Sequence, residues 1–314
     1  MRRLLAWPLA SLLAVAGGVA AAPFAYVSNE KSGSVSVIDV ATDAVAGRIE
    51  VGGKPRGMAL HPTRELLYVS DQPSGSLLAV DLASGAVTQR IALGESPEGL
   101  GISRDGSLVA AAVEVSNSVL LVETAGGSVV ARIRTEGKNP EHAVFSPDGR
   151  WIYVSAEDAT QVDVIDVAAR RQVASIAVGR RPRGIAFAPD GSRAYVACEL
   201  DSTVHVIDVS SRKVLATIAA GEFANGLVAS ADGRRVYVSA GRSASVGVID
   251  TSAARQVATI GVGQRPWNMA LSADGAKLYV ANGRSNSVSV IDTGSARRIA
   301  DIPVGELPWG VVIR

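Results

Sequence analysis

Residues 181–221, RPRGIAFAPDGSRAYVACELDSTVHVIDVSSRKVLATIAAG, decide the fold of this chain. The stretch contains four short runs typical of β-strands, namely GIAF, AYVA, VHVID and VLATIA. PDGS separates the first two runs as a tight turn, because proline presets its φ and glycine tolerates a positive φ. The stretch therefore predicts a unit of four strands.

This unit recurs along the whole chain. The acidic residue that closes each third run marks the period and occurs at Asp39, Asp81, Glu123, Asp166, Asp208, Asp250 and Asp292. These positions are 42 or 43 residues apart. A four-stranded unit repeated at about 40–45 residues is typical of a β-propeller.

The order of the runs predicts how the ring closes. The innermost runs begin after Pro55, Pro97, Pro140, Pro182, Ala224, Pro266 and Pro308. The second runs contain Tyr26, Tyr68, Val109–Val113, Tyr153, Tyr195, Tyr237 and Tyr279. The chain therefore enters at a second strand and ends on an innermost one. We predict an all-β, seven-bladed propeller of four-stranded blades, in which residues 308–313 complete the blade begun by residues 24–51 and remove its open edge.

Residues 1–21 have the pattern of a signal peptide. Arg2 and Arg3 form a basic start, and an apolar stretch rich in small residues follows. Val19 and Ala21 fit the small residues that precede a cleavage site, so we expect cleavage after Ala21 and a periplasmic protein. An uncleaved anchor is the alternative.

Cleavage leaves residues 22–314, a seven-bladed propeller with no expected membrane span. Without the two leader arginines, 29 basic residues stand against 30 acidic ones, a formal charge of −1. This balance gives no reason to expect binding to nucleic acid or an anionic membrane. The single cysteine, Cys198, cannot form an internal disulfide, and we interpret it as a small buried filler, with a reactive thiol as the alternative.

The repeated turn sequences are interpreted as structural. SRDGS, SPDGR, APDGS, SADGR and SADGA join first to second strands. The aspartate that ends each VID is expected to cap the following turn. A metal site built from one such carboxylate per blade is not favoured, because a residue present in every blade serves the repeat.

Functional residues are sought where the repeats differ, around the mouth of the central channel. In ring order, the residues after the first position of each inner strand are Trp309, Arg56, Glu98, Glu141, Arg183, Asn225 and Trp267. The loops after the second strands open on the same face and add the rim residues Glu30, Glu114, Glu157 and Glu199. His142 replaces the glycine of other repeats beside Glu141.

These residues are expected to form a funnel at the mouth of the channel, and two interpretations of the funnel are open. It is either a polar, partly acidic site with an aromatic wall for a small ligand or a partner's side chain, or a structural feature. In the structural interpretation, Arg56–Glu98 and Glu141–Arg183 are ion pairs between blades, and Trp267 and Trp309 pack where the ring closes.

Motifs for catalysis or cofactor binding are not found in the sequence. It contains no CxxCH, no phosphate-binding glycine loop and no GxSxG. His61 and His205 are interpreted as ordinary turn and strand residues. His142 with Glu98, Glu141 and Glu157 is the one plausible metal constellation, but its spacing supports no metal assignment. We predict no catalytic residues, no metal and no cofactor.

The repeats resemble those of the YVTN-repeat β-propellers, on AYVSN, LYVSD, AYVAC and LYVAN. More narrowly, FAYVSNEKSGSVSVIDV, RPRGIAFAPDG, ANGRSNSVSVID and LPWGVVIR resemble the β-propeller proteins associated with PQQ-dependent catabolism. The resemblance covers about residues 24–314 and implies a periplasmic accessory role beside quinoprotein alcohol oxidation. It supplies no active-site motif, and the Trp-docking repeats of quinoprotein dehydrogenases do not occur in this chain, so PQQ itself is not an expected ligand.

Two functional hypotheses follow. The first is a non-catalytic periplasmic binding or scaffold propeller that holds a protein partner or small ligand in the funnel. The alternative is a lactonase-like hydrolase that uses a metal held by funnel carboxylates such as Glu98 and Glu141.

Overall fold

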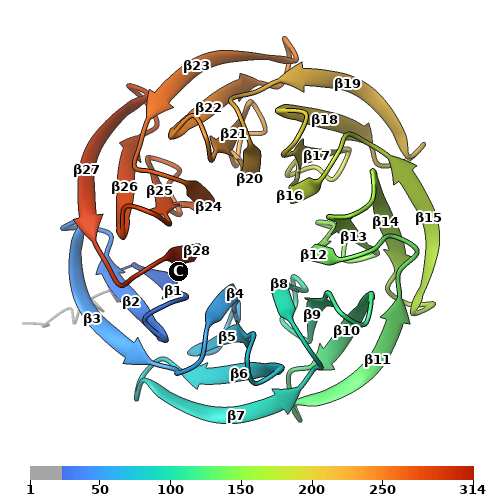
Figure 1. The fold of residues 1–314 in the computed structure, drawn as a ribbon, viewed down its shortest axis with the longest axis vertical. Coiled ribbons are helices and arrows are strands. Elements are labelled where there is room, and N and C mark those ends of the chain that lie inside the picture. The colour runs from blue at the N-terminus through green and yellow to red at the C-terminus, as the bar shows by residue number, and fades with distance from the viewer. Residues whose placement is uncertain (1–22) are drawn as a thin grey trace, which may run out of the picture.

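A computed structural model describes residues 23–314, which form seven sheets of four antiparallel strands arranged around a central channel (Figure 1). This confirms the predicted fold class. We number the blades 1 to 7, starting with the sheet that contains both the first and the last strand. No helix within residues 23–314 is long and apolar enough to cross a membrane. The predicted signal peptide lies outside the described residues.

Each blade has an inner, a second, a third and an outer strand. From blade 1 to blade 7, the inner strands are β28 (Pro308–Ile313), β4 (Pro55–Leu60), β8 (Pro97–Ile102), β12 (Pro140–Phe145), β16 (Pro182–Phe187), β20 (Ala224–Ala229) and β24 (Pro266–Leu271). In the same order, the second strands are β1 (Phe24–Asn29), β5 (Leu66–Asp71), β9 (Leu108–Val113), β13 (Trp151–Ala156), β17 (Arg193–Cys198), β21 (Arg235–Ala240) and β25 (Lys277–Asn282). The third strands are β2 (Ser34–Asp39), β6 (Ser76–Asp81), β10 (Ser118–Glu123), β14 (Gln161–Asp166), β18 (Thr203–Asp208), β22 (Ser245–Asp250) and β26 (Ser287–Asp292). The outer strands are β3 (Ala44–Glu50), β7 (Ala86–Ala92), β11 (Ser128–Arg134), β15 (Arg171–Ala177), β19 (Lys213–Ala219), β23 (Arg255–Gly261) and β27 (Arg297–Pro303).

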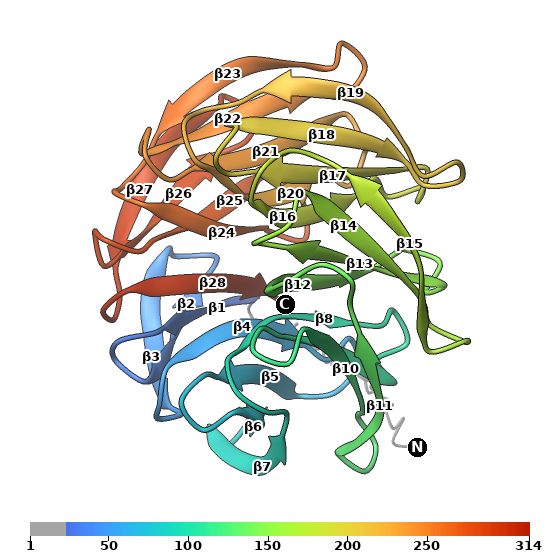
Figure 2. The ribbon, with the colours of Figure 1, turned by 45° about the vertical axis from the view of Figure 1, so that its right-hand side comes forward.

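The C-terminal strand closes the ring as predicted. β28 pairs antiparallel with β1, with Ala25 opposite Ile313 and Val27 opposite Val311. Figure 2 shows β28 beside β1 and β2, although almost the whole chain separates them in sequence. The pairing satisfies the inner edge of β1, which would otherwise present unpaired backbone groups.

The core is divided among the contacts between neighbouring blades. Between blades 2 and 3, for example, Tyr68, Leu77, Val109 and Leu120 pack in one fully or almost fully buried cluster. Apolar residues of this kind favour strands because they pack well on pleated surfaces. Each blade thus buries side chains on both faces, which leaves its inner and outer edges and its connecting loops to carry other functions.

The inner strands approach one another closely at their third residue. A Cβ on Gly57 would lie 2.3 Å from the carbonyl oxygen of Glu98 in the next blade. Ser70 joins the two blades there, because its Oγ accepts the Gly57 N–H at 2.8 Å and donates to that same oxygen at 2.7 Å. Glycine is required where two backbones meet like this. This contact fixes the position along the channel axis of the residue before the glycine. In blade 2 that residue is Arg56, one of the predicted funnel residues.

The turn residues behave as the sequence predicts. Asp208 Oδ1, for example, accepts the Ser211 N–H at 2.7 Å, the expected turn cap. His61 accepts the backbone N–H of Arg64 at 3.0 Å and is part of a turn. Cys198 is fully buried, and burial raises the pKa of its thiol to about 12, so it acts as an inert filler.

We predict that closure by β28 supports the whole ring. Deleting residues 308–314 exposes the edge of β1 and removes the buried Trp309, so Tm should fall by about 10 °C or more. The control is Arg314→Ala, which removes an exposed ion pair to Glu65 and an exposed hydrogen bond to the Arg64 carbonyl, and should leave Tm nearly unchanged. Thermal unfolding followed by circular dichroism measures both, and an unchanged Tm for the deletion contradicts this account of closure.

Candidate functional site

The predicted funnel residues converge on one cavity of about 310 Å³ at the channel mouth. Those that line it are Arg56, Glu114, Glu141, Glu157, Arg183, Asn225, Trp267 and Trp309. The other predicted residues, Glu30, Glu98, His142 and Glu199, do not line this cavity. Glu30, Glu98 and Glu199 contact its arginines, and His142 lies deeper in the channel.

Arg183 is the centre of the larger ion-pair network. Its three guanidinium nitrogens lie 2.8 Å from Glu141, 2.7 Å from Glu157 and 2.8 Å from Glu199. Arg183 exposes only 12% of its side chain, so these pairs operate with little water around them. The surrounding carboxylates raise the pKa of Arg183 despite its burial, which keeps the guanidinium charged.

Arg56 makes a second network on the opposite side of the funnel. Its Nη1 lies 2.6 Å from both carboxylate oxygens of Glu98, and its Nε lies 3.3 Å from Glu30. Gln72 Nε2 also donates to Glu98 at 2.8 Å. Both ion pairs of the structural interpretation therefore exist, and they hold the walls of the cavity in place.

The funnel carries more negative than positive charge. Arg181 and Arg265 add further pairs, with Glu199 oxygens at 3.3 Å and 2.9 Å. Six carboxylates thus stand against four guanidiniums, a formal balance of −2 when all are ionised. Within residues 23–314, Glu114 has no basic partner, and its Oε2 accepts a hydrogen bond from Ser96 at 2.6 Å. One oxygen each of Glu114, Glu141 and Glu157 lies within 4.8 Å of the others.

Burial and the neighbouring charges shift the pKa values of two buried carboxyl groups. Burial and next the charge of Glu141 raise the pKa of Glu98 to about 8, although Arg56 opposes the shift. Burial also disfavours the charged form of Glu141, but Arg183 and weaker positive neighbours outweigh it and lower that pKa. The two neighbouring carboxyl groups therefore have opposite shifts.

Trp309 forms the floor of the funnel. The residue is 7% exposed, and its ring stacks on His142 of blade 4 with ring centroids 5.5 Å apart and an interplanar angle of 10°. The interpretation that both tryptophans pack where the ring closes is therefore wrong for Trp309, which reaches across the channel. Trp267 instead lies over Gly283 of its own blade, where a Cβ would come 2.8 Å from its ring.

Several residues that shape the funnel were missed in the sequence. Arg181 and Arg265 precede the inner-strand proline in the left-handed region, at φ 55° and 54°. Residues there are uncommon unless the surrounding structure holds them, and this backbone turn places both guanidiniums at the mouth. Gln72 shares the loop position of the rim glutamates, and Asn268, like His142, replaces a glycine. Comparison of the aligned repeats could have found all four.

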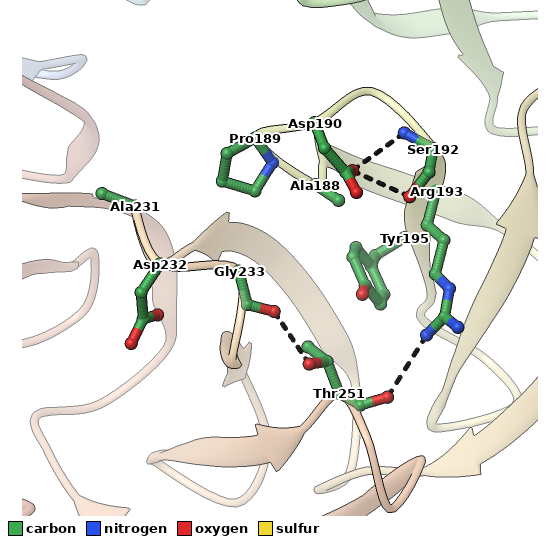
Figure 3. A pocket seen from close by; sticks show the side chains of 10 residues that line it. All are labelled: Ala188, Pro189, Asp190, Ser192, Arg193, Tyr195, Ala231, Asp232, Gly233 and Thr251. Atoms are coloured by element: carbon green, nitrogen blue, oxygen red, sulfur yellow. Dashed lines mark hydrogen bonds between the residues drawn. The ribbon is translucent and has the colours of Figure 1, made fainter.

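A larger groove on the opposite face is a product of the repeat. The groove in Figure 3, about 430 Å³, lies between blades 5 and 6. Its polar groups are used by the turns: Asp190 Oδ1 accepts from Ser192, and Thr251 Oγ1 donates to the Gly233 carbonyl at 2.8 Å. An equivalent groove lies between blades 3 and 4. We therefore place the candidate site in the funnel, where the blades differ.

Comparison with known proteins gives a family and many solved structures of the same fold. The model of the YNCE-like β-propeller family matches residues 6–314. No curated protein sequence matches the chain. Hydrazine synthase of Kuenenia stuttgartiensis is similar at 25% identity, with a TM-score of 0.78 and coverage of 85% of this chain and 92% of that one.

Two further solved structures share the fold at lower identity. A functionally unknown protein from Desulfotomaculum acetoxidans DSM 771 is 17% identical, with a TM-score of 0.82 and coverage of 92% of this chain and 98% of that one. Dihydro-heme d1 dehydrogenase NirN, solved in complex with DHE, is 16% identical, with a TM-score of 0.68 and coverage of 92% and 74%. At these identities the similarity shows the fold alone.

The raised pKa of Glu98 predicts a pH-dependent stability. Between the unfolded pKa of about 4.3 and the folded value of about 8, the unfolded chain releases this proton and the folded protein keeps it. As the pH rises through this window, the free energy of unfolding of the wild type should therefore fall relative to that of Glu98→Gln, which cannot ionise at this position. Urea unfolding from pH 5 to 9 measures the difference.

The control for this prediction is Glu222→Gln. Glu222 lies in an exposed loop with 67% of its side chain accessible, so its substitution should shift stability equally at every pH. A wild-type to Glu98→Gln difference that does not change with pH would mean that Glu98 is ionised throughout and fully neutralised by Arg56.

Proposed function

The chain belongs to the YNCE-like β-propeller family, and from the geometry of its funnel we propose that it is a binding module rather than an enzyme. The observation that carries this proposal is the rigid, multiply paired wall of the 310 Å³ cavity. Arginines hold most of its carboxylates as fixed charges, so the wall is preorganised before a ligand arrives.

The charge of the funnel indicates the chemistry of the bound group. Glu114 supplies uncompensated negative charge beside Glu141 and Glu157. Trp267 adds an aromatic surface to the lining, and the Arg265 guanidinium lies 5.9 Å from its ring centroid. Carboxylates favour a cation. The funnel therefore accepts a small cationic ligand or a basic side chain of a protein partner.

The proposed setting is the periplasm, in an accessory role to a PQQ-dependent alcohol oxidation system. The basis is the leader-like sequence of residues 1–21 and the resemblance of the repeats to propellers associated with that catabolism. We expect export with cleavage after Ala21, so an intact mass that retains residues 1–21 in the periplasmic fraction, or absence from that fraction, contradicts this part of the proposal.

The binding function is tested with defined cations. Calorimetric titration with calcium chloride and, separately, with ethanolamine should show binding of at least one, weakened about tenfold or more by Glu114→Gln. Glu222→Gln, in an exposed loop outside the funnel, is the matched control and should bind as the wild type does. Equal affinity in wild type and Glu114→Gln places any cation binding elsewhere, and absence of binding to both probes contradicts the proposed charge preference.

The second candidate function is a metal-dependent hydrolase. The proximity of Glu114, Glu141 and Glu157 favours it, whereas the contacts of Arg183 with Glu141 and Glu157 oppose it, because a guanidinium already occupies those oxygens. Stoichiometric Ca²⁺, Mg²⁺ or Zn²⁺ in the purified protein, together with lactone hydrolysis that Glu141→Gln abolishes, would decide for this alternative.

A further inference from the structure

A second space lies in the channel, beneath the funnel floor. It measures about 120 Å³ and is lined by the third to fifth residues of several inner strands, so it lies on the turn side of Trp309. Trp309 lines this lower chamber and the funnel cavity alike. The chamber takes no part in the ion-pair networks described above.

Two residues that close the chamber stand where the other inner strands have glycine. Five blades have glycine at the third position, and the other two have His142 and Asn268. β12 adapts to the larger residue: His142 pairs with Ser155, whereas after Pro182 in β16 the next paired residue is Ile185. The local pairing of β12 has therefore changed where an imidazole enters the channel.

Three side chains from three blades meet there. The rings of His142 and Trp309 stack, and Asn268 Nδ2 donates to the Trp309 carbonyl oxygen at 3.3 Å. Nδ1 of the His142 imidazole is buried and has no hydrogen-bond partner within residues 23–314. Blades 1, 4 and 7 thus build one partition across the channel, with the charged funnel above it and the chamber below.

The chamber differs chemically from the funnel. Its wall consists of glycine backbone and apolar side chains such as Leu100 and Val311, with His142 and Asn268 as its polar side chains. Burial lowers the pKa of His142, so the imidazole is neutral at physiological pH. No carboxylate or guanidinium of residues 23–314 lines this space. A charged ligand would lose its hydration there without a counter-charge.

We propose that the lower chamber is a binding site for a small uncharged molecule with one hydrogen-bonding group, of the class of the short-chain alcohols. An apolar lining with a few convergent polar groups is the usual composition of a small-molecule site. A cavity of about 150 Å³ takes up benzene, so this chamber suits a molecule of roughly four to six non-hydrogen atoms. The inference does not depend on the function proposed for the funnel.

Three probes of one shape test this chemistry. Isobutanol carries a hydroxyl group, 1-chloro-2-methylpropane carries no hydrogen-bond donor, and isobutyrate carries a charge. Binding is measured by saturation-transfer NMR on the full-length folded protein, where a roughly millimolar dissociation constant is expected for so small a ligand. Isobutanol should bind more tightly than the chloride by about threefold to tenfold, the ratio for one neutral hydrogen bond. Isobutyrate should not bind.

Variants locate the binding site. Asn268→Leu keeps the side-chain volume nearly the same but removes the amide. The affinity for isobutanol should then fall to that for 1-chloro-2-methylpropane. Asn268→Gly, which restores the residue of five other blades, should lose the same preference and keeps the test valid if the leucine variant misfolds. Gln89→Leu, an amide-to-leucine change on the exposed strand β7, is the matched control and should bind as the wild type does.

Other outcomes overturn the proposal. Equal affinity for isobutanol and the chloride would show a merely apolar cavity, and binding of isobutyrate would contradict the neutral lining. Failure of all three probes at concentrations of tens of millimolar would mean that the space holds water alone. A preference for isobutanol that survives both Asn268 variants and also His142→Gly would place the bound alcohol elsewhere.

Discussion

The close approach of neighbouring inner strands is the constraint on which the rest of this structure depends. At Gly184, as at Gly57, the backbone of one blade meets a carbonyl of the next so closely that a Cβ would come 2.5 Å from the Asn225 oxygen. Five of the seven inner strands make such a contact through a glycine, and together the strands surround one narrow channel. The residue before the third position of each inner strand then belongs to a ring around the channel. A substitution at any one of these positions brings its side chain close to the others. Function can therefore be built from single substitutions in an otherwise regular repeat.

The polar groups of the channel are sorted by depth. Guanidiniums and carboxylates gather at the mouth, where Arg183 contacts three carboxylates and retains some access to water. Partly buried ion pairs add little net stability because desolvation offsets their attraction. Their effect is to fix long side chains in one arrangement, which suits a binding wall. Below Trp309 the polar side chains are neutral, and the partition separates two spaces of different chemistry.

The repeat made most of the fold predictable. The spacing of Asp39, Asp81 and their equivalents determined the number of blades, and the position of the first and last strands determined the closure. Strand order also identified the ring of funnel residues, because equivalent positions in a repeat lie at equal heights. The same reasoning located Glu141 beside Arg183.

The remaining features depend on directions that strand position does not specify. A tryptophan at the second position can pack over its own blade, as Trp267 does, or cross the channel, as Trp309 does. The choice depends on His142, in a strand more than 160 residues away in the sequence. Arg181 precedes its inner strand in the left-handed region, as Ser96 and Phe223 do in other blades, so comparison of the repeats, and not the local strand pattern, places it at the mouth. Side-chain direction and backbone strain therefore limited the sequence-based view of the site.

The partition of the channel by Trp309 and His142 is tested most directly by acrylamide quenching of indole fluorescence. In a protein with Trp151 and Trp267 replaced by phenylalanine, the signal of the folded chain comes from Trp309 once the leader containing Trp7 is removed. Trp309 should be strongly shielded, and His142→Gly, which restores the glycine of the repeat, should raise its quenching constant severalfold while the ring stays folded. Equal quenching with and without the imidazole would contradict a partition held by this stack.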